Sequence, residues 1–102
     1  GFHAHNNLGM AVANSVAAIE AGAKIIDGSA RGFGAGAGNA HLEALVAVLN
    51  QMNYFTGIDL YKLLDAGDIA ELTMIETMPY INSSSIVSGL AGGIFWFFEP
   101  CK

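Results

Sequence analysis

A twofold alternation of strand-like and helical segments constrains the fold of this chain more than any other feature of its sequence. Residues 1–5 are expected to form the end of a buried strand, and residues 8–21 carry apolar side chains at helical spacing. Residues 24–28 again suit a short parallel strand, and residues 39–52 again carry a helical apolar stripe. A βαβα order is typical of a parallel sheet whose strands are joined by helices. The sequence therefore predicts an α/β fold.

Punctuating residues mark the ends of these two units. Gly22 stands where a glycine commonly ends a helix, and Asn39 is expected to cap the second helix. The alternation stops near Gly57, which places two βα units in residues 1–56 and a helical segment in residues 57–102.

The second segment has its own predicted boundaries. Asp59 is expected to cap a third helix, followed by an acidic stretch that runs to Thr77 and is broken by Pro79. One of the serines at 83–85 is expected to cap a last, apolar helix extending from about Ile86 to Phe98.

The composition limits the classes of function. The chain is 53% hydrophobic and only 13% charged, which resembles the interior of a larger protein more than a free-standing small domain. Its net charge of −5 leaves no basic patch for nucleic acid, and the apolar residues 10–23 are too few to span a bilayer. Cys101 is the single cysteine, so an internal disulfide framework is excluded. Without a secretory signal pattern, we expect a cytoplasmic protein that binds neither nucleic acid nor membrane.

Two histidines, His3 and His5, stand one residue apart at the end of the first strand-like segment. Alternate side chains of a strand point to the same face, so these imidazoles would project together, about 6.5 Å apart along the strand. That spacing allows both to bind one metal ion, and the carboxyl ends of parallel strands are where α/β proteins place their chemistry. The pair predicts a metal site, with two core histidines as the alternative.

The glycine-rich residues 31–38 suggest a nucleotide-binding loop, but their order excludes it. A dinucleotide fingerprint starting at Gly32 requires a glycine where this chain has Ala37. A P-loop requires Lys and Ser or Thr after its last glycine, where this chain has Asn39 and an alanine. Two interpretations stay open: a turn whose backbone amides bind a carboxylate, or glycines that only permit close packing.

These motifs together resemble a known superfamily. The run HAHNNLGMAVANS at residues 3–15 resembles the second metal motif of the hydroxymethylglutaryl-coenzyme-A-lyase-like superfamily of metal-dependent TIM barrels, and within it most of all the 4-hydroxy-2-oxovalerate aldolase branch. The other matching runs are residues 26–29, 31–40, 43–49 and 89–92. The resemblance is weaker over residues 57–88.

The resemblance implies a fold and an activity. Residues 1–56 would be the last βα units of a TIM (β/α)8 barrel, and residues 57–102 a helical C-terminal segment that in these aldolases packs against an acylating acetaldehyde dehydrogenase. The implied reaction is the metal-dependent retro-aldol cleavage of 4-hydroxy-2-oxopentanoate, a small 2-oxo acid, to pyruvate and acetaldehyde in the catabolism of aromatic compounds. The implied cofactor is a divalent metal ion, usually Mn²⁺. The family's metal-binding aspartate, its neighbouring arginine and its catalytic histidine precede the first motif, so we expect this chain to be part of a longer enzyme.

The resemblance also assigns residues. His3 and His5 match the two histidine ligands. The candidate substrate or supporting contacts are Asn7, Asp27, Ser29 and Asn39. Asp27 would orient a ligand or simply form a strand-end hydrogen bond, Arg31 would add polar lining, and His41 would be structural or solvent-facing. Ile94 stands where the family has an active-site tyrosine, and isoleucine can donate neither a proton nor a hydrogen bond.

Two other functions remain in competition at this stage. Another enzyme of the superfamily, resembling 2-isopropylmalate synthase or hydroxymethylglutaryl-coenzyme-A lyase, would act on an acyl-coenzyme-A substrate. The lyase branch carries a cysteine in its glycine loop, and residues 32–38 have none, which favours the aldolase. A catalytically incomplete fragment is the second alternative, favoured by Ile94 and by the missing aspartate.

Overall fold

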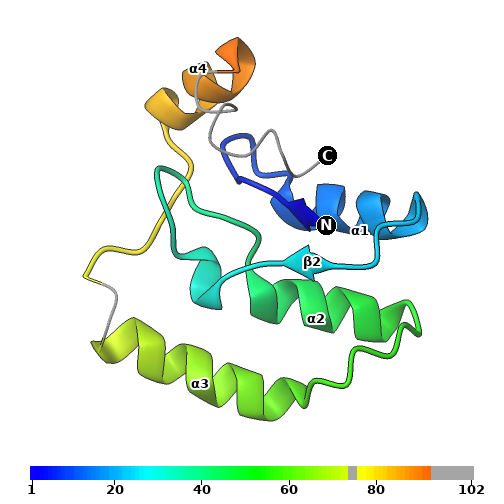
Figure 1. Cartoon of the computed structure of the whole chain (residues 1–102). Helices are drawn as coiled ribbons and strands as arrows, with labels where there is room; N and C mark the ends of the chain where they lie inside the picture. The colour runs from blue at the N-terminus through cyan, green and yellow to red at the C-terminus, as the bar shows by residue number, and fades with distance from the viewer. Residues whose placement is uncertain (74–75, 93–102) are drawn as a thin grey trace.

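The computed structural model describes residues 1–73 and 76–92, which form an α/β arrangement (Figure 1). Strand β1 (Phe2–His3) pairs in parallel with β2 (Ile26–Asp27), and His3 lies opposite Asp27. Within the described residues the helices are α1 (Ala11–Glu20), α2 (Leu42–Gln51), α3 (Leu60–Thr73) and α4 (Ser83–Ala91), and a 3-10 turn, η1 (Ala30–Gly32), follows β2. The predicted α/β class and the order strand, helix, strand, loop, helix are confirmed.

Helix α1 begins at Ala11 and not at Leu8, because a turn precedes it. The Gly9 amide donates to the Asn6 carbonyl at 3.0 Å, and Gly9 has a φ of 75°, a conformation that favours glycine. The side-chain oxygen of Asn6 accepts the Ala11 amide at 3.1 Å, which satisfies an amide at the start of the helix. At the other end Gly22 has a φ of 109° and its amide donates to the Ile19 carbonyl, as predicted for a helix-ending glycine.

The core is small and is built from small side chains. Ala4, Ala11 and Ala40 form a buried cluster against which Phe2 packs, so β1, α1 and the segment before α2 approach closely. In α2 the side chains of Leu45, Val46 and Leu49 are buried, as the apolar stripe predicted, whereas Met52 follows the helix and is 39% exposed. Dense packing of this kind fixes the strand ends that carry the candidate site.

The predicted cap of α2 was wrong. His41, not Asn39, precedes the helix, and its Nδ1 accepts the Ala44 amide at 3.2 Å. Asn39 is unable to cap because the chain is still extended there: the next residue, Ala40, donates its amide to the Ala4 carbonyl at 3.1 Å. Neighbouring backbone segments therefore decide where α2 begins.

The predicted cap of α4 was wrong by one residue. Asn82 precedes the serines and is extended, and its side-chain oxygen accepts the Ser85 amide at 2.9 Å. In return the Ser85 hydroxyl oxygen accepts the Asn82 amide at 3.0 Å, which completes a reciprocal capping box. Helix α4 ends at Ala91, followed by Gly92 with a φ of 67°, and the remainder of the predicted helix, residues 93–98, lies outside the described residues.

Helix α3 runs alongside α2, packs against it and against η1, and leads toward the segment that carries α4 (Figure 1). The predicted cap is confirmed, since the Asp59 carboxylate accepts the Lys62 amide at 3.2 Å. The helix extends to Thr73, and residues 74 and 75 of the acidic stretch that follows lie outside the described residues. The helical character predicted for the second segment is confirmed within the described residues, and its boundary after residue 56 stays a prediction.

Two further predictions concern residues that the structure does not describe: Ile94, in place of the family tyrosine, and Cys101 both lie outside the described ranges. Over residues 1–73 and 76–92, every helix is too short or too polar to cross a bilayer.

Candidate metal centre

The two predicted ligands, His3 and His5, come together at the carboxyl end of β1. His3 ends the strand, and His5 continues in a single antiparallel bridge with Asn39. The centres of the two imidazole rings lie 5.0 Å apart and the ring planes meet at 77°, edge to face. The expected juxtaposition of alternate side chains is therefore observed. Their role as ligands stays a prediction.

Asp27 is placed to orient His3. The parallel register of β1 and β2 puts these residues side by side, and a carboxylate oxygen of Asp27 is hydrogen-bonded to Nδ1 of His3. A carboxylate on one imidazole nitrogen favours the tautomer that carries the proton there, so the other nitrogen, Nε2, keeps its lone pair for a ligand. This contact is compatible with both roles considered for Asp27, and the orienting role stays a prediction.

The surroundings of His5 favour its neutral form. Burial lowers the pKa of His5 below the usual value for histidine, the neighbouring His3 lowers that pKa further, and Asp27 partly raises it again. A metal binds the neutral imidazole, so a lowered pKa keeps His5 ready to bind at neutral pH.

Asn39 connects the glycine loop to the histidines. Its backbone bridges to His5, its amide donates to the Gly32 carbonyl at 2.8 Å, and its side-chain nitrogen donates to the Phe33 carbonyl at 3.1 Å. A Cβ added at Gly34 would collide with the Asn39 side chain. The loop glycine therefore permits close packing at this point, one of the two interpretations that the sequence left open.

The remaining predicted residues lie in different places. The Asn7 residue is 9% exposed, its carbonyl accepts the Ser85 hydroxyl at 3.2 Å, and it lines the pocket described next. Ser29 belongs to the loop itself, because its hydroxyl donates to the Phe33 carbonyl at 2.7 Å and its amide to the Ala40 carbonyl. The structure thus brings together His3, His5, Asp27 and Asn39, with Asn7 nearby and Ser29 in the supporting loop.

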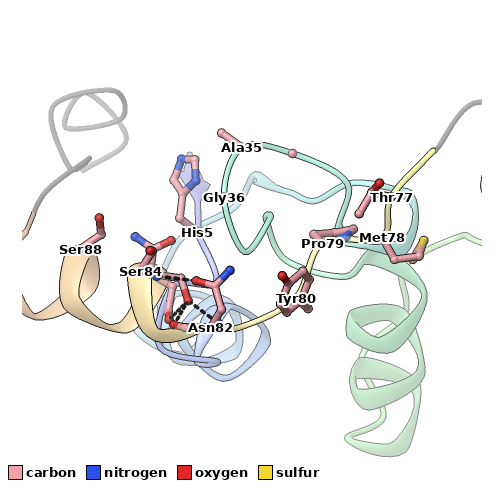
Figure 2. Close-up of a pocket in the computed structure, with 13 residues that line it drawn as sticks. His5, Ala35, Gly36, Thr77, Met78, Pro79, Tyr80, Asn82, Ser84 and Ser88 are labelled. Atoms are coloured by element: carbon pink, nitrogen blue, oxygen red, sulfur yellow. Dashed lines mark hydrogen bonds between the residues drawn. The ribbon is translucent and has the colours of Figure 1, made fainter.

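A pocket of about 510 Å³ opens beside His5. Its walls are loop residues 34–36, the segment 77–80 and one side of α4. Figure 2 shows the His5 ring between the loop at Ala35 and the serine-bearing side of α4. Pockets of this size hold small organic ligands.

Sequence reasoning missed Glu43, which is 2% exposed. Its carboxylate oxygens accept the Arg31 amide at 3.0 and 3.3 Å, and one also lies 3.3 Å from Nδ1 of His41. Arg31, expected to line the site, instead directs its guanidinium to Glu43 and to Asp68 and Glu71 on α3. A signal was present, since an acidic residue in the first turn of α2 adjoins its apolar stripe.

Among residues 1–73 and 76–92, no group of three or more His, Cys, Asp or Glu side chains is arranged to hold a metal ion. The described residues thus offer two imidazole ligands and one orienting carboxylate. These groups fit a divalent cation in type, since imidazole is a common ligand and a carboxylate behind it is its usual support.

Comparison with known proteins assigns the family. The family model described as HMGL-like matches residues 1–70. The chain belongs to the HMGL-like family. It is 66% identical over 100 residues to the 4-hydroxy-2-oxovalerate aldolase of Spirochaeta aurantia, a match that covers 98% of this chain and 29% of that protein. It is also 69% identical over 91 residues to the 4-hydroxy-2-oxovalerate aldolase of Streptomyces griseus, covering 89% of this chain and 27% of that protein.

A more distant relative is similar over the whole chain. The 4-hydroxy-2-oxovalerate aldolase 1 of Azoarcus sp. is 51% identical over 102 residues, covering 100% of this chain and 29% of that protein. The chain thus spans less than a third of the length of the curated relatives that it matches.

Proposed function

We propose that this chain is part of a 4-hydroxy-2-oxovalerate aldolase, and that the whole protein cleaves 4-hydroxy-2-oxopentanoate to pyruvate and acetaldehyde, a step in the breakdown of aromatic compounds. The observation that carries the proposal is the paired His3 and His5 with Asp27 behind them, in a chain 66% identical to a protein of that name.

The proposed fold is the last part of a TIM (β/α)8 barrel followed by a helical segment. The parallel pairing of β1 with β2, joined through α1, is the repeating unit of such a barrel. His3 and Asp27 lie at the carboxyl ends of their strands, where barrel enzymes place their active sites. Both features support the barrel, and membership in the HMGL-like family supports it further.

We propose that the imidazoles of His3 and His5 hold a divalent cation, Mn²⁺ in the first instance, with Asp27 orienting His3. When bound, such a cation supplies Lewis acidity to the carbonyl oxygen of a 2-oxo acid. The chain's own contribution is to keep His5 neutral through burial and to fix the tautomer of His3.

The pocket beside His5 would receive the substrate. In the cleavage the bond between C3 and C4 breaks, the C4 hydroxyl loses its proton as the aldehyde forms, and C3 takes up a proton to give pyruvate. A pocket of about 510 Å³ has room for a substrate this small.

An acylating acetaldehyde dehydrogenase is the proposed partner, and α4 is the proposed contact. Val87 and Leu90 are 65% and 76% exposed on this short helix, and exposed apolar side chains gathered together commonly mark an interface. Packing of α4 within the same longer protein is the competing explanation. Co-purification of the full-length protein with such a dehydrogenase supports the partner, and a clean monomer at micromolar concentration contradicts it.

The deciding experiment measures metal content and pyruvate release in the full-length protein. We expect pyruvate release that a chelator abolishes and added Mn²⁺ restores. His3→Ala and His5→Ala should lose both metal and activity, whereas Asn50→Ala, on the exposed side of α2, should retain both. Pyruvate release that survives the chelator, or that survives both histidine substitutions, contradicts the proposal.

A further inference from the structure

Glu43 is the one buried charged residue within the described parts of the chain, and its carboxylate holds the backbone of a distant turn. The side chain is 2% exposed, and its two oxygens lie 3.0 and 3.3 Å from the Arg31 amide nitrogen. Nη1 of the same arginine lies 3.4 Å from Oε2. A carboxylate is costly to bury unless such donors compensate it, so this contact requires a reason.

The reason lies in the backbone of Arg31. Its φ of 54° and ψ of 17° lie in the left-handed region. Glycine adopts this conformation freely and asparagine and aspartate do so at times, but other residues rarely do. The hydrogen bond from its amide to Glu43 favours this conformation. The turn then presents the carbonyl of Gly32 to the amide of Asn39, at 2.8 Å.

The segment around Asn39 is in turn bound to the strand that carries the histidines. Asn39 bridges to His5, the Asn6 amide donates to the Gly38 carbonyl at 2.8 Å, and the Ala40 amide donates to the Ala4 carbonyl at 3.1 Å. A continuous path of hydrogen bonds therefore runs from the Glu43 carboxylate through Arg31 and Asn39 to the backbone beside His5.

A second, independent observation comes from α3. A Cβ added at Gly67 would collide with a carboxylate oxygen of Glu43, so glycine at this position makes room for the buried group. The Arg31 guanidinium also binds Asp68 and Glu71 from α3, which hold the arginine against the same helix. Helix α3 is thus shaped to enclose the contact between Glu43 and Arg31.

We propose that Glu43 is a positioning residue for the histidine site, which acts through Arg31 by fixing loop residues 32–39 against His5. What it positions, a metal-binding histidine pair, rests on the proposed function. The conformation that Glu43 imposes on the loop is independent of the proposed function.

The test compares two substitutions in the full-length protein. Glu43→Gln removes one acceptor oxygen from the buried contact, and Glu71→Gln is the matched control, because Glu71 is 47% exposed and binds the same arginine at 3.0 Å. In the metal-free protein, amide hydrogen exchange over residues 32–40 should be about tenfold faster in Glu43→Gln, the factor expected for one lost hydrogen bond. Exchange in α1 should be unchanged, and Glu71→Gln should match the wild type.

A second readout is the dissociation constant for Mn²⁺. It should rise about tenfold or more in Glu43→Gln while the far-ultraviolet circular dichroism stays constant, because loss of a supporting contact behind a ligand costs that much affinity. Should Glu43→Gln fail to fold, Gly67→Ala provides the second variant, since it displaces the carboxylate without removing it.

Unchanged exchange over residues 32–40 in Glu43→Gln overturns the proposal, and so does an equal increase in Glu71→Gln or throughout the protein. Failure of the proposed function is seen separately: a wild-type protein that neither binds Mn²⁺ nor releases pyruvate refutes the aldolase assignment, whatever the exchange pattern. A wild-type protein that does both, with Glu43→Gln indistinguishable from it, refutes the positioning role alone.

Discussion

The left-handed conformation of Arg31 leads to a quantitative prediction from a pair of substitutions. Arg31→Ala and Arg31→Gly both remove the guanidinium and both keep the amide that donates to Glu43. The two variants therefore differ only in what the backbone conformation costs. At a φ of 54°, an L-residue costs about 1–2 kcal/mol that glycine does not.

The magnitude follows from three contributions. The lost ion pairs with Asp68 and Glu71 are exposed and contribute about 0–1 kcal/mol each. These losses are equal in both variants, and so is the loss of the contact between the guanidinium and Glu43. Glycine loses about 0.4–1 kcal/mol more chain entropy on folding than alanine, which offsets part of its conformational advantage. We therefore expect Arg31→Gly to be more stable than Arg31→Ala by about 0.5–1 kcal/mol, and both to be less stable than the wild type.

The assay is urea unfolding of the full-length protein, with the midpoints compared at equal dependence on denaturant. Val48→Ala and Val48→Gly, on the exposed side of α2, serve as a control pair, because there the order should reverse: glycine is about 1 kcal/mol worse than alanine inside a helix. If Arg31→Ala equals or exceeds Arg31→Gly in stability, the left-handed conformation is not what Glu43 supports, and the reasoning fails.

Three further predictions test the site and its surroundings. Asp27→Asn should raise the Mn²⁺ dissociation constant of the full-length protein about tenfold or more, because it weakens the acceptor behind His3, and unchanged metal affinity would refute the orienting role. In the metal-free protein, nuclear magnetic resonance should show His5 titrating below the usual pKa of histidine. Because the pKa of His5 is lower in the folded state, the unfolded chain binds more protons, and the free energy of unfolding should fall as the pH drops through and below the usual pKa. His5→Asn should remove this pH-dependent loss. Asn82→Ala should lower the free energy of unfolding by about 1 kcal/mol through loss of the capping box, whereas Ser83→Ala should change it by less than about 0.5 kcal/mol, and equal effects would contradict the assignment of the cap.

The elements that the sequence predicted are those whose signals are local. Periodic apolar side chains located α1 and α2. In α2 the predicted face is the buried one, whereas in α1 the buried residues are Ala11 and Ser15 and the periodic apolar side chains are only partly buried. The boundaries were less accurate, because they depend on partners remote in sequence. Asn39 has the chemistry of a helix cap, but the strand bearing His5 holds its backbone extended. At the start of α4 the missed signal was local, since Asn82 and Ser85, three residues apart, form the capping box.

The candidate site likewise combines features that the sequence predicted with a contact that it did not predict. The approach of His3 to His5 follows from the two-residue period of a strand, and the place of Asp27 follows from parallel pairing of neighbouring βα units. Neither the spacing of apolar residues nor the pairing of strands indicates that Glu43 would bind the Arg31 amide. That contact requires Arg31 to adopt a left-handed backbone conformation, which no local sequence pattern favours.

The contact between Glu43 and Arg31 also explains why a chain this apolar keeps a buried carboxylate. Replacing Glu43 alone with an apolar residue of similar volume would break a buried contact by removing one of its two partners, which is destabilising, whereas replacing both partners is often neutral. In this structure it would also leave the Arg31 amide without its acceptor, and would release the turn that presents the Gly32 carbonyl to Asn39. A variant such as Glu43→Leu should therefore lower the free energy of unfolding by about 1–3 kcal/mol, the cost of a buried amide left without its acceptor. The loop beside His5 would also lose its single conformation, and with it the fixed distance between the loop and the histidine pair.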